Sequence, residues 1–315
     1  MHQYFLGIDA GQSATAALVA DETGRVLGEG SAGSCDHIGT SEGRERFRAA
    51  IGGAVRAALQ KAGFPEKTQF AAACLGLSGG PAQKEALVRE LISAHHLKIT
   101  TDALVALTGA LAGGPGVIAI AGTGSIAFGR NAAGKIARTG GWGYAFGDEG
   151  GAFDIVRQAL RAALRNEEGW GTATALGEVL HQATGVANMN DLLHRFYTPE
   201  YPRAKIASYA RLVDQAARDG DHTARDIMSA AAQALATCVS AVRRQLFQRG
   251  ETVPVSYIGG VFESEIVRER FRLLVELEED AQVQPPAFGP AAGALIEAFR
   301  LANMSLNPVN TPAGV

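Results

Sequence analysis

The chain has few cysteines and no long hydrophobic segment, and both absences exclude classes of protein. Its 315 residues include only three cysteines, Cys35, Cys74 and Cys238, which are scattered and lack C-x-x-C spacing. This argues against a disulfide framework or a cysteine-based metal site and is typical of a reducing cytoplasm. No apolar run is long enough to span a bilayer, and a strand predicted close to the N-terminus leaves no room for a signal peptide. We therefore expect a cytoplasmic protein.

An excess of charge of one sign is also missing. The 29 Lys and Arg residues against 32 Asp and Glu residues leave a net charge of -3. Such a balance offers no electrostatic argument for binding nucleic acid or an anionic membrane. The hydrophobic fraction of 47% is that of an ordinary globular protein. The chain is long for one hydrophobic core, so two domains are expected.

One arrangement occurs twice in the chain. The apolar run 4–8 leads into the loop 9–13 (DAGQS), and roughly 110 residues later the run 117–121 leads into the loop 122–125 (GTGS). Each loop is followed by a strand, an Asx-x-x-Gly turn and another strand. Two such loops facing each other would offer backbone N–H groups to a phosphate chain from both sides. The repeat therefore predicts a nucleotide held between two related domains.

The rest of the pattern alternates helices and strands in both halves. After an N-cap at Ser41, apolar residues recur every four positions until Gly63 ends the helix. Further strands are predicted at 70–77, 97–101 and 253–258, and further helices at 81–92, 103–112, 151–165, 172–184, 202–219, 222–248, 264–277 and 290–302. The segment 113–116 breaks the pattern and the tail from 307 is expected to fray. This order predicts the α/β class, with two tandem ribonuclease-H-like domains and helical insertions in the second.

Six motifs carry a resemblance to a known family. They are GIDAG at 7–11, TDA at 101–103, GTGS at 122–125, GGWG at 140–143, GDEG at 147–150 and GGVF at 259–262. In this order and spacing the chain resembles the sugar kinase/actin/Hsp70 superfamily. Within it, the chain is similar to the N-acetylglucosamine kinase group of the BadF/BadG/BcrA/BcrD ATPase family. The resemblance implies actin-like domains over 1–114 and 115–315, with a last helix that could pack back on the N-terminal domain.

The two loops and Asp9 point to a nucleotide and its metal. A carboxylate that closes a buried strand is costly unless it is paired or near a cation, although an Asx-turn alone would also explain Asp9. With the second loop echoing the first, we predict that Asp9 holds Mg²⁺ through water. The resemblance implies that both loops bind the phosphates of ATP and that the turn after strand 253–258 binds its adenosine. The predicted ATP ligands are Gly11, Gln12, Ser13, Gly122, Thr123, Gly124, Gly259 and Gly260.

Asp102 has two interpretations that do not exclude each other. Aspartate before an Ala-rich helix is a good N-cap. A carboxylate at the carboxyl end of a strand can also accept a proton from a substrate hydroxyl as phosphoryl transfer proceeds. The resemblance places the family's catalytic base at Asp102.

The segment 140–151 is rich in glycine and contains three aromatic residues. It would either pack an aromatic core or form a saccharide loop, in which aromatic faces lie on a sugar ring and carboxylates accept bonds from its hydroxyls. The resemblance implies the saccharide loop. The predicted substrate ligands are Asp36, Ser78, Asp102, Ser125, Gly141, Trp142, Gly143, Tyr144 and Asp148. Related eukaryotic kinases have asparagine where Asp36 stands, which leaves the sugar open among N-acetylglucosamine, glucosamine and N-acetylmuramic acid.

The expected function is ATP-dependent and Mg²⁺-dependent phosphorylation of an amino sugar, with N-acetylglucosamine at its C6 hydroxyl as the first choice and glucosamine as the alternative. A second class is an ATPase that switches a partner, as in dehydratase activators with a shared Fe–S cluster. Cys74 in a predicted strand and Cys238 in a predicted helix are not placed for such a cluster. A third hypothesis is a protein that binds a sugar without catalysing a reaction. The expected partner is a small amino sugar, without nucleic acid or membrane, and a homodimer is left open.

Overall fold

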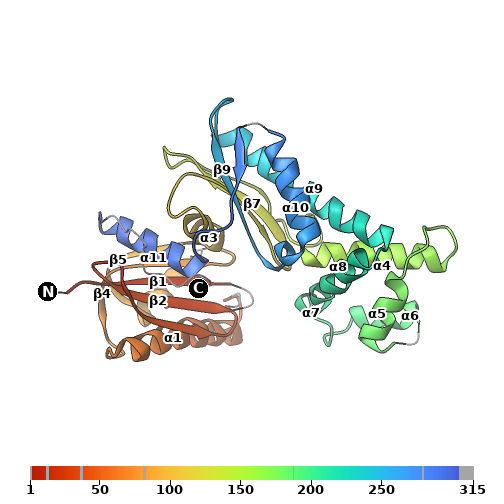
Figure 1. The fold of residues 1–315 in the computed structure, drawn as a ribbon. Coiled ribbons are helices and arrows are strands. Elements are labelled where there is room, and N and C mark those ends of the chain that lie inside the picture. The colour runs from red at the N-terminus through yellow and green to blue at the C-terminus, as the bar shows by residue number, and fades with distance from the viewer. Residues whose placement is uncertain are drawn as a thin grey trace. The chain divides into compact units, whose positions relative to one another are not determined.

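The computed structural model describes residues 2–11, 14–35, 38–80, 83–186, 188–278 and 280–304. The chain divides into two compact units (Figure 1). One contains the residues up to Gly116 together with the segment from Pro285 onward, and the other contains Val117–Gln284. Each unit is built on a five-stranded sheet. The α/β class, with two related domains and helical insertions in the second, is confirmed, whereas the tail from 307 lies outside the described residues.

The sheet of the first unit has the order β3-β2-β1-β4-β5. Its strands are β1 (Tyr4–Ala10), β2 (Thr15–Asp21), β3 (Val26–Ala32), β4 (Gln69–Leu77) and β5 (Ser93–Thr101). Its helices are α1 (Ser41–Ala62), α2 (Glu85–Leu91), α3 (Asp102–Ala110) and α11 (Pro290–Leu301). β1 is antiparallel to β2 and parallel to β4, and β4 is parallel to β5. The last helix in sequence thus belongs to the first unit.

The sheet of the second unit has the order β8-β7-β6-β9-β10, which repeats the order of the first sheet strand for strand. Its strands are β6 (Gly116–Ala121), β7 (Ser125–Arg130), β8 (Ile136–Gly140), β9 (Val253–Ile258) and β10 (Ala281–Val283). Its helices are α4 (Ala152–Glu167), α5 (Leu176–Thr184), α6 (Met189–Phe196), α7 (Arg203–Ser208), α8 (Ala210–Arg218), α9 (His222–Leu246), the short η1 (Gly260–Glu263) and α10 (Glu265–Glu276). The repeated strand order confirms the arrangement read from the sequence.

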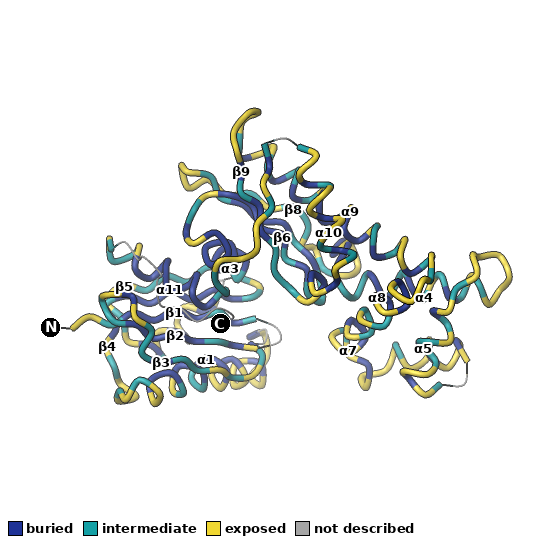
Figure 2. Tube along the Cα trace, viewed as in Figure 1, coloured by how far each residue is buried: buried dark blue, intermediate teal, exposed yellow. Residues whose placement is uncertain are grey.

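Both faces of the first sheet are covered by helices, and its central strands β2, β1 and β4 are largely buried, whereas β3 and β5 are mostly only partly buried (Figure 2). Leu6 and Ile8 of β1 belong to the core beneath α1, whereas Phe5 belongs to the core beneath α11 and stacks on Phe299 with ring centroids 3.9 Å apart. This alternation follows from the period of two along a strand. Gly7 also faces α11, and a Cβ there would collide with main-chain atoms of that helix. A side chain at this position would therefore keep α11 from the sheet.

Several predicted boundaries shift in the structure. The N-cap of α1 is Thr40 rather than Ser41, because the Thr40 hydroxyl accepts the hydrogen bond from the Gly43 amide at 3.0 Å. The helix ends at Gly63, with φ of 75°, as predicted. The predicted helix 202–219 splits into α7 and α8 because the Tyr209 amide bonds to the Ile206 carbonyl, which tightens the chain into a 3₁₀ turn.

Four further elements differ from the prediction. β5 begins at Ser93 rather than 97 and forms one end of the sheet order, where exposed residues such as His95 and His96 are tolerated. α5 begins at Leu176 because the Asp221 carboxylate binds the residues just before it. β10 spans three residues, which is too short for a hydrophobic period in the sequence to predict it. α6 was not predicted.

Candidate functional site

The carboxyl ends of three neighbouring strands meet at one edge of the first sheet. Leu77, the last residue of β4, pairs with Ala10 of β1 on one side and with Thr101 of β5 on the other. Asp9 and Asp102 therefore stand at the same edge, on either side of β4. Ligands of α/β proteins usually bind at the carboxyl ends of parallel strands. The structure thus brings the two predicted acidic residues to one place.

Asp9 is a carboxylate in a setting that favours a cation. Burial raises its pKa to about 7, and the negative charge of Asp102 adds to the increase. No cluster of three His, Cys, Asp or Glu residues able to hold a metal occurs among the described residues. A cation beside Asp9 would stabilise its ionised form, so this carboxylate could hold a metal ion such as Mg²⁺, which keeps most of its water ligands.

Asp102 is the first residue of α3, and the N-cap is Thr101. The Thr101 hydroxyl accepts from the Leu104 amide at 3.3 Å, while Oδ1 of Asp102 accepts from the Ala103 amide at 2.9 Å. The N-cap interpretation of Asp102 was therefore wrong by one residue. Its carboxylate lies in the first helical turn, where the free N–H groups stabilise negative charge. Within the described part of the chain, Oδ2 of Asp102 has no hydrogen bond and is available to a substrate.

Lys84 is a residue of this edge that the sequence analysis missed. It is only 4% exposed, and its Nζ donates to the Ser78 carbonyl oxygen at 2.7 Å. The Ser78 amide in turn donates to the Ala10 carbonyl oxygen at 3.0 Å. These bonds tie the segment after β4 to the end of β1. No sequence signal marks Lys84, because a lysine beside polar residues is normally assumed to be exposed.

Gly11 connects the first glycine loop to the segment that precedes Asp36. Its amide donates to the Ala14 carbonyl oxygen and its carbonyl oxygen accepts from the Cys35 amide, both at 3.0 Å. Three of the predicted ligands, Gln12, Ser13 and Asp36, lie outside the described residues, so their roles stay predictions.

The loop between β6 and β7 is tied to the first turn of α4. The amides of Ala152 and Phe153 donate to the carbonyl oxygens of Gly122 and Thr123, at 2.8 and 3.1 Å. Within the loop, the Gly122 amide donates to the Gly124 carbonyl oxygen at 3.0 Å. A Cβ on Gly122 would meet no other atom within 4 Å. The loop is thus held in place on one side and has open space on the other, as a phosphate-binding loop requires.

Asp148 packs directly against this loop. It is 8% exposed, its Oδ1 accepts from the Gly143 amide at 3.2 Å, and a Cβ on Gly124 would collide with its carboxylate. Its φ of +63° is uncommon for a residue other than glycine, and such backbone often occurs at functional sites. The Ser125 hydroxyl donates to the Glu149 carbonyl oxygen at 2.7 Å, which leaves its lone pairs as acceptors.

The aromatic side chains of this segment are exposed. Trp142 is 66% exposed, Tyr144 50% and Phe146 89%. These values contradict the alternative in which the segment packs an aromatic core. Arg138 lies over the Trp142 ring at 4.6 Å and Arg203 over the Tyr144 ring at 5.4 Å. Exposed aromatic faces close to buried Asp148 offer the combination of apolar and polar surface that binds a sugar ring.

The turn after β9 lies beside the loop after β6. Gly259 has a φ of 112°, and a Cβ there would collide with the Ala121 carbonyl group and lie 3.0 Å from the Gly122 amide nitrogen. Gly260 opens η1. The structure therefore collects the predicted residues in two groups. The first unit holds Asp9, Gly11, Ser78 and Asp102, and the second holds Gly122, Thr123, Gly124, Ser125, Gly141, Trp142, Gly143, Tyr144, Asp148, Gly259 and Gly260.

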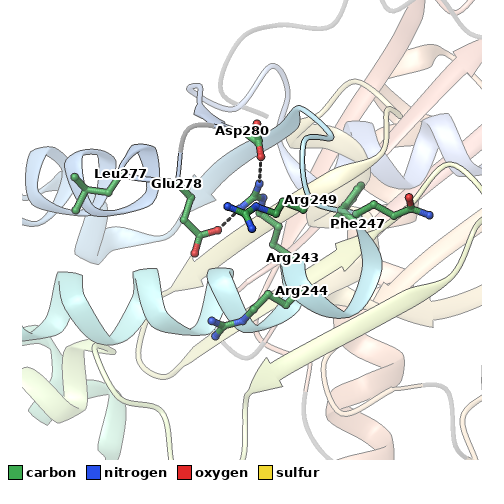
Figure 3. Close-up of a pocket in the computed structure, with 8 residues that line it drawn as sticks. Arg243, Arg244, Phe247, Arg249, Leu277, Glu278 and Asp280 are labelled. Atoms are coloured by element: carbon green, nitrogen blue, oxygen red, sulfur yellow. Dashed lines mark hydrogen bonds and ion pairs between the residues drawn. The ribbon is translucent and has the colours of Figure 1, made fainter.

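A separate cavity of about 630 Å³ lies at the end of α9 (Figure 3). It is lined by Arg243, Arg244, Phe247, Gln248, Arg249, Leu277, Glu278 and Asp280. The Arg243 side chain is 11% exposed and forms ion pairs with Glu278 and Asp280. These ion pairs fasten the end of α9 to the segment after α10. No predicted site residue lines this cavity.

Comparison with known proteins agrees with these features. An N-acetylmuramic acid/N-acetylglucosamine kinase of Clostridium acetobutylicum is 31% identical over 281 residues, which cover 87% of this chain and 91% of that protein. An N-acetyl-D-glucosamine kinase of Dictyostelium discoideum is 28% identical over 314 residues, covering 94% and 98%. A crystal structure from Chromobacterium violaceum, 24% identical, covers 95% of this chain and 99% of its own with a TM-score of 0.77, which shows a shared fold.

The two repeated sheets, each with a glycine loop after its central strand and the first with two carboxylates at its strand ends, define a protein of the actin-like ATPase fold. Residues 6–298, which make up most of the chain, match the BadF/BadG/BcrA/BcrD ATPase family. The chain belongs to this family. Among the described residues, no helix combines the length and the apolar character needed to cross a membrane.

Proposed function

We propose that this protein transfers the γ-phosphoryl group of ATP to a hydroxyl group of an amino sugar, with the C6 hydroxyl of N-acetylglucosamine as the first choice. The observation that carries the proposal is Asp102, a carboxylate at a strand end with one oxygen free in the described part of the chain. Two relatives that are named as amino-sugar kinases and cover most of the chain support it. A cytoplasmic location and a homodimer stay predictions.

Asp102 would act as the general base. Its carboxylate, stabilised by the first turn of α3, orients the sugar hydroxyl and accepts the hydroxyl proton as the oxygen attacks phosphorus. The attacking bond forms as the bond between phosphorus and the leaving oxygen of ADP breaks. Because catalysis of this reaction is mainly positioning and electrostatic stabilisation, one aligned carboxylate suffices on the acceptor side.

The phosphate donor would be bound by the glycine loops. Asp9 would hold Mg²⁺ through water, and this ion, when bound, neutralises charge on the phosphate oxygens. The proposed ATP ligands are Gly11, Gln12, Ser13, Gly122, Thr123, Gly124, Gly259 and Gly260. The fixed loop at 122–124 supports this assignment, because its carbonyl groups already bond to α4 and its open side is free for a phosphate.

The sugar would be bound by exposed aromatic faces and buried acceptors. The proposed ligands are Asp36, Ser78, Asp102, Ser125, Gly141, Trp142, Gly143, Tyr144 and Asp148. Trp142 and Tyr144 would pack on the apolar face of the ring, and Asp148 would accept from its hydroxyls. The burial of Asp148 supports this role, since a buried carboxylate requires donors.

The decisive experiment measures sugar-dependent release of ADP with N-acetylglucosamine, glucosamine and glucose, for the wild type and for Asp102→Asn. We expect turnover of the variant to fall by about 10²- to 10⁴-fold or more, while calorimetry still detects binding of nucleotide and sugar. More than about a tenth of wild-type turnover would contradict the base assignment. If glucosamine is the best substrate of the wild type and Asp36→Asn reverses that order, glucosamine replaces N-acetylglucosamine as the proposed substrate.

The alternative of a dehydratase activator is disfavoured by the cysteines. Cys74 is fully buried in β4, and burial raises the pKa of its thiol to about 12. Burial also raises the pKa of Cys238, which lies inside α9. Fe–S clusters require accessible thiolates, which these environments oppose. Iron analysis of the anaerobically purified protein tests this directly.

A further inference from the structure

Arg157, on the second turn of α4, binds the segment 140–151 from the side of this helix. One terminal nitrogen of its guanidinium group donates to the Tyr144 carbonyl oxygen at 3.0 Å, and the other donates to Oδ1 of Asp154 at 2.6 Å. Oδ2 of Asp154 in turn accepts from the Gly150 amide at 3.1 Å. The ion pair of Asp154 and Arg157 therefore holds the segment at two positions, Tyr144 and Gly150.

The ion pair is built into the second unit. The side chain of Asp154 is 13% exposed and that of Arg157 is 32% exposed. Hydrogen bonds that involve charged groups are stronger than those between neutral groups. Gly150 packs closely on α9, because a Cβ there would lie 2.6 Å from the Ala231 carbonyl oxygen. The segment is thus fixed at Gly150, and the ion pair extends this fixed point to Tyr144.

Tyr144 lies in a short turn whose orientation depends on α4. The amides of Phe146 and Gly147 donate to the Gly143 carbonyl oxygen at 3.2 and 2.9 Å, which closes the turn. The Tyr144 ring makes an edge contact with the ring of Phe153 on α4, with the ring centroids 5.2 Å apart. The helix therefore contacts both the main chain and the ring of Tyr144.

The same helix holds the loop 122–124 through main-chain groups. The amides of Ala152 and Phe153 donate to two carbonyl oxygens of this loop, at 2.8 and 3.1 Å. Replacing the side chain of Arg157 leaves these amides unchanged. Loss of Arg157 should therefore release the turn around Tyr144 without altering the loop that is assigned to ATP.

We infer that Arg157 is a positioning residue for the acceptor sugar, which together with Asp154 fixes Tyr144 in the orientation that packs on the sugar ring. The inference rests on the proposed function, in which Tyr144 contacts the sugar. A loop that is ordered before binding loses less conformational entropy when the ligand binds. Because Arg157 acts through Tyr144 and not on the reacting atoms, it changes the affinity for the sugar rather than the chemical step.

The test measures kcat and the KM values for N-acetylglucosamine and ATP in Arg157→Met. We expect the KM for the sugar to rise about 10-fold, the low end for a hydrogen bond to a charged group. The kcat, the KM for ATP and the thermal midpoint should stay close to those of the wild type. Arg157→Lys keeps the charge but offers a single nitrogen, so its KM for the sugar should rise less. Arg161→Met, which removes an exposed arginine one turn further along α4, is the matched control and should change none of these values.

A double-mutant cycle shows whether Arg157 acts through the Tyr144 ring. Tyr144→Ala leaves no ring to position, so adding Arg157→Met to it should raise the KM for the sugar by less than about twofold. Additive effects of the two substitutions would overturn the inference. Hydrogen exchange of peptides from 140–150, measured without ligand, should be faster in Arg157→Met than in wild type or Arg161→Met. Equal exchange in all three proteins would also overturn it.

The outcomes separate the inference from the proposed function. Wild-type turnover of the sugar, with an unchanged KM for the sugar in Arg157→Met, would overturn the inference and leave the kinase assignment intact. A lower thermal midpoint with a rise in both KM values would assign the ion pair to the stability of the second unit and would overturn the inference as well. Absence of turnover with every sugar in the wild type would contradict the proposed function and, with it, the inference.

Discussion

Asp9→Asn should stabilise the ligand-free first unit at neutral pH, although it removes a proposed functional residue. The pKa of Asp9 is raised from 3.8 to about 7 by burial and by the charge of Asp102. Because the folded state binds the proton of Asp9 more tightly than the unfolded state does, the contribution of Asp9 to the free energy of unfolding is highest below about pH 4. This contribution falls as the pH rises to about 7. A difference of about three pKa units corresponds to at most roughly 4 kcal/mol. An amide at this position does not titrate and escapes this loss.

The expected net gain is smaller, because the buried amide keeps a desolvation cost of about 1–3 kcal/mol. We expect Asp9→Asn to be roughly neutral at pH 4.5 and stabilising by about 1–3 kcal/mol at pH 8. Asp102→Asn provides the matched comparison. It removes the like charge, so the pH range in which the protein loses stability should move toward acid.

The assay must report on the first unit alone. Both tryptophans, Trp142 and Trp170, lie in the second unit, so intrinsic fluorescence does not serve. Hydrogen exchange of peptides from β1 and β4, in chelator and without nucleotide, gives the opening free energy at each pH. A stability difference between Asp9→Asn and wild type that is the same at pH 4.5 and pH 8 would refute the reasoning.

Three further substitutions test the scaffold and the site. Gly7→Ala should destabilise the first unit by at least about 2–3 kcal/mol in denaturant titrations, because its Cβ meets the main chain of α11; a loss below 1 kcal/mol would contradict this packing. Gly124→Ala should displace Asp148 and lower kcat/KM up to about 100-fold with an unchanged thermal midpoint, measured on the same sample. Arg243→Met should cost about 2 kcal/mol at pH 7, because it removes the cation that pairs with Glu278 and Asp280. Burial opposes ionisation of Glu278, but its hydrogen bonds to Ser240 and Arg243 hold its pKa below the usual value, so the cost should shrink only at acid pH, as the carboxylate becomes protonated. A cost that is independent of pH would point to packing rather than charge.

The sequence by itself determined the features that depend on neighbouring residues. The strand, glycine loop and strand order appears twice because alternating apolar residues and turn residues act over short distances. The stop of α1 at Gly63 follows from the left-handed backbone that glycine adopts readily. The motifs at the strand ends indicated where carboxylates and loops would gather, because the carboxyl ends of parallel strands share one edge.

Tertiary structure alone decided features that depend on segments far apart in the chain. The burial of Lys84 results from the surrounding fold, and nothing in its own segment distinguishes it from an exposed lysine. The start of α5 depends on Asp221, which lies 46 positions beyond the Ala175 amide that it binds. The pKa of Asp9 is raised because folding removes its carboxylate from water and brings the charge of Asp102 near it. Desolvation and charge pairing act through space, so the local pattern does not contain them.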